Sequence, residues 1–218
     1  MEEIIKDIRF RLRKAMNGIV SASMRQKGVE YKLNFGVSIP EIKAIATAYQ
    51  PNEELAQWLW SQDVREHKIL ATILYPHEAF TKEQAENWAG DIRHQEIAEL
   101  FCINLLQHLA FAKELAEQWI KDDREYVKVC GFLLYVRLYK QGNTTLSADY
   151  LLAEAKKTID SGISHPQRAA VLALKHYGRQ GKTESNAVLD SFKDYQHSES
   201  SVKQETYNDL AFEFEYYQ

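Results

Sequence analysis

Residues 31–46 read Tyr-Lys-Leu-Asn-Phe-Gly-Val-Ser-Ile-Pro-Glu-Ile-Lys-Ala-Ile-Ala, and they mark the passage from a polar aromatic segment into a helix. Ser38 can cap that helix, Pro40 suits its first turn, where a missing N–H costs nothing, and Glu41 favours the positive helix end. Apolar residues then recur at helical spacing, at Ile39, Ile42, Ile45 and Ala46. The stretch predicts a loop followed by a capped amphipathic helix over 39–49.

Helix breakers are scarce along the whole chain. The 218 residues include 9 Gly and 4 Pro, about half of average usage. Most glycines fall at expected helix joints, whereas Gly131 lies inside an apolar helical run, where a close contact with another helix would explain it. We therefore predict an all-α protein in which helices follow one another with short joints.

Four of the expected helices share one pattern, a polar first turn followed by an apolar body around a small residue. They cover 64–75, 91–106, 123–139 and 165–177, and their small residues are Ala71, Cys102, Gly131 and Ala170. These residues lie roughly 30 to 40 positions apart, in the range of HEAT-type repeats. We predict a HEAT-like repeat α-solenoid with a concave groove, as a single domain over 1–218, with 196–218 as an acidic aromatic tail. A non-repeating helical bundle is the alternative.

The formal net charge of −4 hides an uneven distribution. Residues 1–50 carry nine Lys and Arg against five acids, whereas residues 183–218 carry eight acids against two lysines. This excludes a uniformly basic surface and leaves room for local basic faces that could meet a polyanion. The charged first residues, the lack of an apolar run of ~20 residues and two cysteines in apolar settings predict a cytoplasmic protein with no membrane contact.

Polar and basic side chains gather on the four repeated helices, mainly in their first turns. Candidates for contact with DNA phosphates are Arg65, Lys68, Arg93, Gln95, Lys128, Arg168, Lys175 and Arg179. The alternative is that they are ordinary solvated helix ends, because phosphate-binding patches are usually denser in Lys and Arg. The chain has no glycine-rich phosphate loop and no familiar spacing of metal ligands, so we expect no cofactor and no metal site.

Three stretches of the sequence match a known pattern: the run from Met24 to Lys43, Trp60 followed by Glu66-His-Lys-Ile-Leu-Ala71, and the run from His165 to Gly178. They resemble the AlkD-like DNA alkylation repair family, whose members are all-α proteins of HEAT-like repeats. The resemblance covers roughly residues 20–180. It implies the fold, and it implies DNA as the partner.

Members of that family are N-glycosylases that release N3- or N7-alkylated purines. Their active cleft uses a Trp and an Asp one helical turn apart, an Arg on a following helix and a second Trp on a late helix. The positions that match here are Gln95 with Glu99, Lys128, and Leu172. Glu99 is the candidate catalytic residue, because a carboxylate there could stabilise oxocarbenium character at the sugar and position water. Both aromatic side chains are replaced, so the resemblance predicts the fold and leaves the activity a hypothesis.

The resemblance implies a DNA-binding repair protein, either an N-glycosylase or a binder of damaged or branched DNA. The alternative function is a non-catalytic HEAT-repeat scaffold for a protein partner, which the negative net charge and the acidic 196–218 segment favour. Clustered Arg and Lys on the binding face would favour DNA, and a mixed or acidic face would favour a protein.

Overall fold

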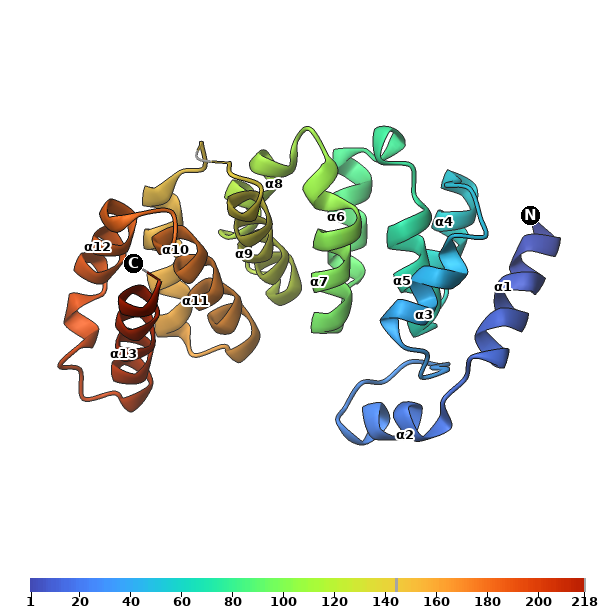
Figure 1. The fold of residues 1–218 in the computed structure, drawn as a ribbon, viewed down its shortest axis with the longest axis horizontal. Coiled ribbons are helices and arrows are strands. Elements are labelled where there is room, and N and C mark those ends of the chain that lie inside the picture. The colour runs from blue at the N-terminus through green and yellow to red at the C-terminus, as the bar shows by residue number, and fades with distance from the viewer. Residues whose placement is uncertain (144, 218) are drawn as a thin grey trace. The chain divides into compact units, whose positions relative to one another are not determined.

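The computed structural model describes residues 1–143 and 145–217, which form thirteen α-helices, three short 3-10 helices and no β-strand (Figure 1). The all-α prediction is confirmed. The α-helices are α1 (Glu2–Lys14), α2 (Gly18–Gln26), α3 (Ile39–Ala46), α4 (Glu53–Ser61), α5 (Arg65–Leu74), α6 (Lys82–Asp91), α7 (Gln95–Asn104), α8 (Ala112–Trp119), α9 (Glu125–Lys140), α10 (Ala148–Ser161), α11 (Ser164–Gly178), α12 (Lys182–Ser191) and α13 (Ser201–Tyr216). The 3-10 helices are η1 (His77–Ala79), η2 (Leu106–His108) and η3 (Lys193–Tyr195).

The chain divides into two compact units, Met1–Trp88 and Ala89–Gln218, and α6 runs from the first into the second. Helices that follow one another pack in pairs, α4 on α5 in the first unit, and α8 on α9 and α10 on α11 in the second. The α9 helix also packs on α7 and α11, which makes it the centre of the second unit. Stacked pairs of this kind are what a repeat architecture requires. The single domain over 1–218 stays a prediction.

A buried ion pair holds the segment that precedes α3. The Glu66 carboxylate accepts hydrogen bonds from the backbone N–H groups of Phe35 (3.1 Å) and Val37 (3.2 Å). The Arg65 guanidinium donates to the Val37 carbonyl at 2.9 Å and to the Glu66 carboxylate at 2.9 Å. Both charged side chains are buried, and a buried charge is tolerated only when it is paired and hydrogen-bonded. This arrangement, which we call the clamp, fixes residues 35–37 on the start of α5.

The clamped segment sets the position of the two helices beside it. On its C-terminal side, Ser38 and Glu41 form the capping box that begins α3, so the predicted cap is confirmed. On its N-terminal side, the Ser21 hydroxyl of α2 donates to the Asn34 carbonyl at 2.8 Å, and the Asn17 N–H donates to the Phe35 carbonyl at 2.9 Å. Gly36 has a φ of +68°, and a Cβ there would collide with the backbone of α2. Only glycine therefore allows α2 to lie this close.

Gly131 marks a close backbone contact between α8 and α9. A Cβ built on Gly131 would lie 2.5 Å from the Ile120 nitrogen and 2.7 Å from the Trp119 carbonyl carbon, at the end of α8. The close contact that the sequence analysis inferred from this glycine is confirmed. Trp119 itself is fully buried, at the point where the end of α8 lies against the bare backbone of Gly131 in α9.

The last helix differs from the sequence expectation. We predicted an acidic aromatic tail over 196–218, whereas most of that segment forms α13, which packs on α11 and α12. Its residues Thr206, Leu210 and Phe214, at intervals of four, are buried, and Phe214 contacts Gly178 at the end of α11. The alternating stretch Phe212-Glu-Phe-Glu-Tyr216 belongs to this helix.

Gly131→Ala is expected to lower the free energy of unfolding by about 1–3 kcal/mol, because the added methyl group meets backbone atoms that cannot move aside. The matched control is Gly90→Ala in α6, where a Cβ would make only an ordinary 3.5 Å contact with the Arg124 side chain. That change should be neutral or stabilising by up to about 1 kcal/mol, since alanine favours helix. Urea unfolding followed by circular dichroism measures both. Equal effects at the two glycines would contradict a special role for the α8–α9 contact.

Candidate nucleic-acid interface

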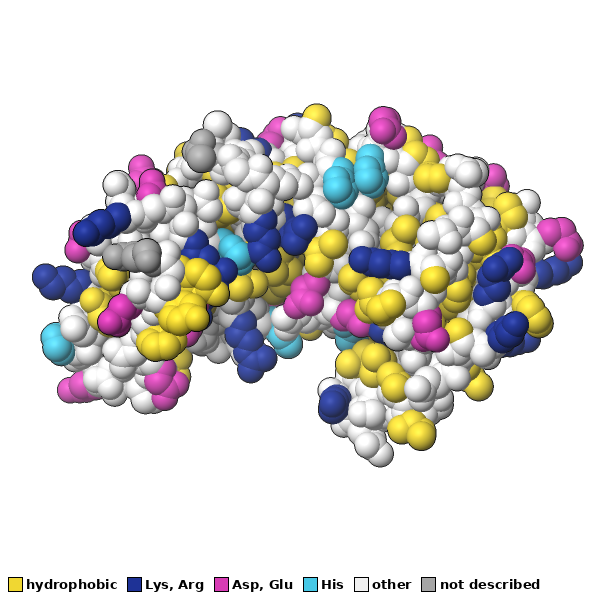
Figure 2. Space-filling view, in the orientation of Figure 1, with side chains coloured by type: hydrophobic (Ala, Val, Ile, Leu, Met, Phe, Trp, Pro, Cys, Tyr) yellow, Lys and Arg dark blue, Asp and Glu magenta, His cyan; other side chains and the backbone are white. Residues whose placement is uncertain are grey.

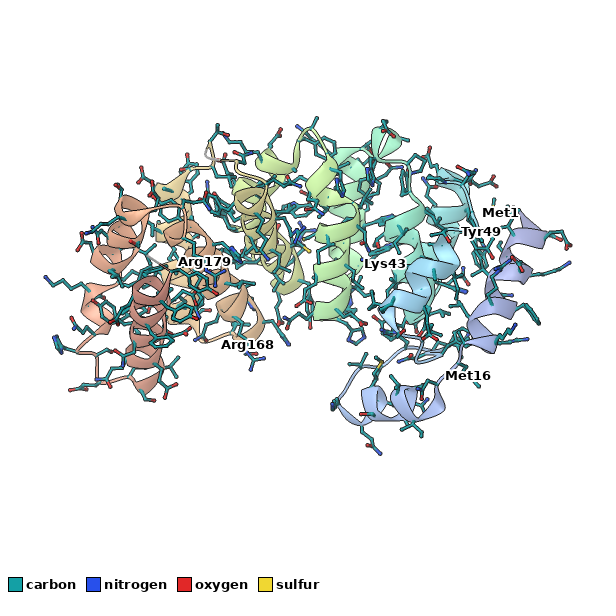
Figure 3. The ribbon with its side chains drawn as sticks, viewed as in Figure 1. Met1, Met16, Lys43, Tyr49, Arg168 and Arg179 are labelled. Atoms are coloured by element: carbon teal, nitrogen blue, oxygen red, sulfur yellow. The ribbon has the colours of Figure 1, made fainter. Side chains whose placement is uncertain are left out.

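One face of α11 carries a row of basic side chains. Arg168, Leu172, Lys175 and Arg179 follow one another at intervals of four, three and four residues, which places them on one side of the helix. Arg168 and Arg179 mark the two ends of α11 in Figure 3. Arg168 is exposed and makes no ion pair within the described ranges. Figure 2 shows Lys and Arg side chains gathered over α9 and α11.

The neighbouring helix α9 adds two more cations next to this row. Arg137 and Lys140 are three residues apart and therefore share a face of α9. The Arg137 guanidinium donates to the neutral side-chain oxygen of Gln107 at 2.9 Å, and Lys140 is exposed without an ion pair in the part of the chain that the structure describes. Burial, and then the charges of Lys140, Arg179 and Arg137, lower the pKa of His176 to about 4. These three cations therefore surround one buried, neutral histidine.

Two carboxylates of α13 face the same cations. Lys175 Nζ lies 2.7 Å from Asp209 and 3.5 Å from Glu213, and Arg179 Nε donates to Glu213 at 2.6 Å. The ring of Tyr217 also lies 4.3 Å from the Arg179 guanidinium carbon. We call Arg137, Lys140, Lys175 and Arg179 the cationic cluster. Its four positive charges meet two carboxylates, so among the residues that the structure describes two positive charges have no acidic partner.

The two candidates of the first unit serve the protein interior. Arg65 is 1% exposed and belongs to the clamp, so it cannot reach a phosphate, and its prediction as a DNA-binding residue is wrong. The position carries an arginine because the Val37 carbonyl and the Glu66 carboxylate need a buried donor. Lys68 is half-buried, donates to the Trp60 carbonyl at 2.8 Å and lies 4.5 Å from the centre of the Trp60 ring. Trp60 in turn stacks on Trp88 with ring centres 4.1 Å apart.

Two further candidates of the second unit, Arg93 and Lys128, lie outside the cationic cluster. Arg93 is exposed and donates to the carbonyls of Gly90 (2.7 Å) and Ile92 (2.9 Å), where α6 ends. Lys128 makes no ion pair within the described residues, but it lies nine residues before Arg137, which is half a turn away around α9. It therefore points away from the cationic cluster.

Gln95 and Glu99, which match the family's catalytic pair, lie together in the first turns of α7. The Gln95 amide donates to Glu99 at 2.8 Å, and both side chains are half-buried. Leu172, which matches the late tryptophan, is 38% exposed in the row of basic residues on α11. Glu99 therefore offers a carboxylate and Leu172 offers an aliphatic side chain, and none of the three positions carries an aromatic ring.

Sequence reasoning missed one aromatic pair and two cations. The rings of Tyr126 and His165 lie 5.6 Å apart in the first turns of α9 and α11, and His165 Nδ1 lies 2.7 Å from Glu125. Neither Arg137 nor Lys140 was among the predicted phosphate contacts. Arg137 and Lys140 lie three residues apart near the end of a helix that is otherwise apolar. That spacing was the available signal, because two charged residues on one side of an apolar helix mark the side that faces solvent.

Within the described residues, no group of His, Cys, Asp and Glu could hold a metal ion, and no helix is long and apolar enough to cross a membrane. Cys102 and Cys130 are both buried and free. Burial raises the pKa of the Cys102 thiol, whose sulfur lies 3.6 Å from the Cys130 carbonyl oxygen. Both thiols are therefore part of the packing between α7 and α9.

Comparison with known proteins agrees with the fold. The family model described as DNA alkylation repair enzyme matches residues 2–208. A solved structure from a family of proteins related to the HEAT-like repeat DNA glycosylases, with affinity for branched DNA structures, is similar with a TM-score of 0.76 and 17% identity. That match covers 95% of this chain and 94% of the other. It confirms the predicted HEAT-like repeat fold. A search among curated protein sequences found no match.

Two buried histidines are expected to make stability fall in mild acid. The pKa of His176 and that of His67 are both lowered from 6.5 to about 4, mainly by burial. The unfolded chain takes up protons first, so the unfolding free energy should fall as the pH drops from about 6.5 to about 4, by about 1.4 kcal/mol per pH unit for each histidine. Above pH 6.5 this contribution is fully present.

Urea unfolding across that pH window, with His67→Phe and His176→Phe beside the unaltered chain, measures the effect. Each variant should show a flatter pH dependence, because it lacks one group that protonates only on unfolding. His67 offers the cleaner comparison, since both its ring nitrogens are buried without a hydrogen-bond partner in the described residues. An unchanged slope in either variant would mean that its histidine is charged in the folded protein.

Proposed function

Because the chain belongs to the DNA alkylation repair family, we propose that it binds DNA and that the cationic cluster on α9 and α11 contacts the phosphate backbone. The observation that carries this proposal is the excess of two positive charges on the cluster, in a protein whose net charge is −4. Backbone phosphates supply most of the affinity of non-specific DNA binding. A local basic face on an acidic chain concentrates binding at one place.

The row on α11 suits an extended polyanion. Arg168 and Arg179 are eleven residues apart, which is roughly 16 Å along a helix. A DNA strand carries a phosphate every ~3.4 Å of helix axis, so the row spans several phosphates. Arginine can donate two parallel hydrogen bonds to one phosphate, which makes Arg137 and Arg168 the main contacts and Lys140 a supporting charge.

Branched DNA is the first DNA structure to test, because the structurally similar protein comes from a family with affinity for it. Release of N3- or N7-alkylated purines is the second candidate function, and Glu99 carries it. This carboxylate is half-buried and held by Gln95, so it has a fixed orientation. A protein-interaction scaffold would be the function if the chain bound no duplex or branched DNA at low salt. The cytoplasmic location also stays a prediction.

The double reversal Arg137→Glu with Lys140→Glu is expected to weaken binding to duplex and branched DNA by roughly tenfold or more, since it removes two phosphate contacts and adds two repulsive charges. Fluorescence anisotropy with labelled DNA at low salt measures it. Lys128→Glu, on the opposite face of α9, and Lys157→Glu, which reverses an exposed lysine of α10 paired with Glu154, are the matched controls. Comparable weakening in the controls would remove the cluster as the binding face.

Glu99→Gln is expected to abolish base release from DNA that carries N7-methylguanine or N3-methyladenine, without changing DNA affinity. The amide keeps the shape of the side chain and loses the negative charge that would stabilise the developing sugar cation. Chromatography of released bases, with binding measured on the same preparations, checks this. Undiminished release by the variant would assign the chemistry to another residue, and no release by the unaltered protein would leave DNA binding alone.

A further inference from the structure

The stretch from the second turn of α1 to just beyond the end of α2 is strongly basic. Residues 8–29 contain six Lys and Arg and no Asp or Glu. Arg11 is paired with Asp7 at 2.8 Å, whereas Arg13 and Lys14 are exposed and make no ion pair within the described parts of the chain. This positive charge lies in the first unit and is separate in sequence from the cationic cluster.

Large apolar side chains are exposed among these cations. Ile19 is 85% exposed, Phe10 is 65% exposed and Met16 is 59% exposed. Phe10, Arg13 and Lys14 share one face of α1 at spacings of three and four residues. Met16 lies in the turn after α1 (Figure 3), and Ile19 lies in the first turn of α2. We call these five residues the elbow surface.

The elbow surface stands on a fixed base. Ile8 and Leu12 on the other face of α1 are fully buried, and the Asp7 carboxylate accepts from the Tyr49 hydroxyl, beyond α3, at 2.6 Å. The Asn17 side chain caps α2, which is itself docked on the clamped segment. The apolar side chains are therefore presented by helices that are anchored in the core, so their exposure does not come from a frayed terminus.

An open groove of about 650 Å³ lies beside this surface, between α1 and α3. Its apolar lining includes Phe10, Ala15, Ala44 and Ile45, and Lys14 supplies a cation without a partner in the structure's described ranges. The acid that lines it from α3, Glu41, is engaged in the capping box. The groove thus offers an aromatic ring and a positive charge side by side.

We propose that the elbow surface binds an unpaired nucleic-acid strand, with Arg13 and Lys14 on its phosphates and Phe10 stacked on a base. Single strands are bound by this combination of cations and stacking rings, because every unpaired base exposes an apolar face. A duplex hides those faces and would gain only the electrostatic part. The proposal extends the proposed DNA binding, on which it rests, to the unpaired strands that occur at branch points.

An anionic membrane is the other polyanion with an apolar part, and the geometry disfavours it. A helix that lies in a membrane interface needs a broad continuous apolar face. The apolar face of α1 is already buried through Ile8 and Leu12. What remains exposed is single apolar side chains separated by cations, which suits separate bases.

The test measures binding of a labelled oligothymidine strand and of a matched duplex at low salt by fluorescence anisotropy. Phe10→Ala should weaken oligothymidine binding by roughly tenfold, the effect of losing one stacked base. Its affinity for the duplex should stay unchanged. Arg13→Glu with Lys14→Glu should weaken oligothymidine binding at least as much. Lys6→Glu, on the same helix but paired with Glu3, is the matched charge control and should change it by less than about threefold.

The outcomes separate the two proposals. If the elbow variants bind oligothymidine as the unaltered chain does, or if that chain does not bind it, the elbow proposal is overturned. If Arg137→Glu with Lys140→Glu leaves duplex binding intact, the proposed phosphate contacts fail and the elbow result stands by itself. Sedimentation with phosphatidylserine vesicles, lost in Phe10→Ala while oligothymidine binding is retained, would assign the surface to a membrane. The variants alter exposed side chains, and circular dichroism verifies that they are folded.

Discussion

The Glu66 carboxylate is the interaction on which the first unit depends. It accepts hydrogen bonds from two backbone N–H groups of a loop that has no secondary structure of its own, while Arg65 neutralises it and satisfies a carbonyl of the same loop. Removing one member would leave the other buried and unpaired, which costs roughly 3–5 kcal/mol. The loop in turn sets where α2 docks and where α3 begins. One buried charge pair therefore connects α2, α3 and α5.

Positive charge has two separate uses in this chain. Arg65, Lys68, Lys175 and Arg179 hold carbonyls, carboxylates or aromatic rings of the protein itself. Arg13, Lys14, Lys140 and Arg168 face solvent and make no ion pair with any residue that the structure describes. A count of basic residues cannot separate these groups, because an arginine that builds the core and an arginine that binds a ligand look alike in the sequence.

Local signals were predicted well, and long-range partners were not. The capping box of Ser38 and Glu41 lies within one helical turn. Gly131 lies inside an apolar helical run, where a glycine indicates a close helix contact. Both signals can therefore be read from the local sequence. The role of Arg65 depends on Val37, and that of Lys175 depends on Asp209, 34 residues away. Such pairs form only when the helices stack. The predicted helix over 165–177 differs from α11 by one residue at each end.

The carboxylates of α13 have a thermodynamic consequence for any polyanion that reaches α11. A free lysine or arginine that meets a phosphate sets free the small cations condensed on the nucleic acid, and the entropy of that release drives binding. Lys175 and Arg179 already hold Asp209 and Glu213, so engaging a phosphate there exchanges one anion for another and leaves two carboxylates in need of new counterions. The entropic drive would thus come from fewer cations than the face displays. The last helix sets how far binding responds to ionic strength.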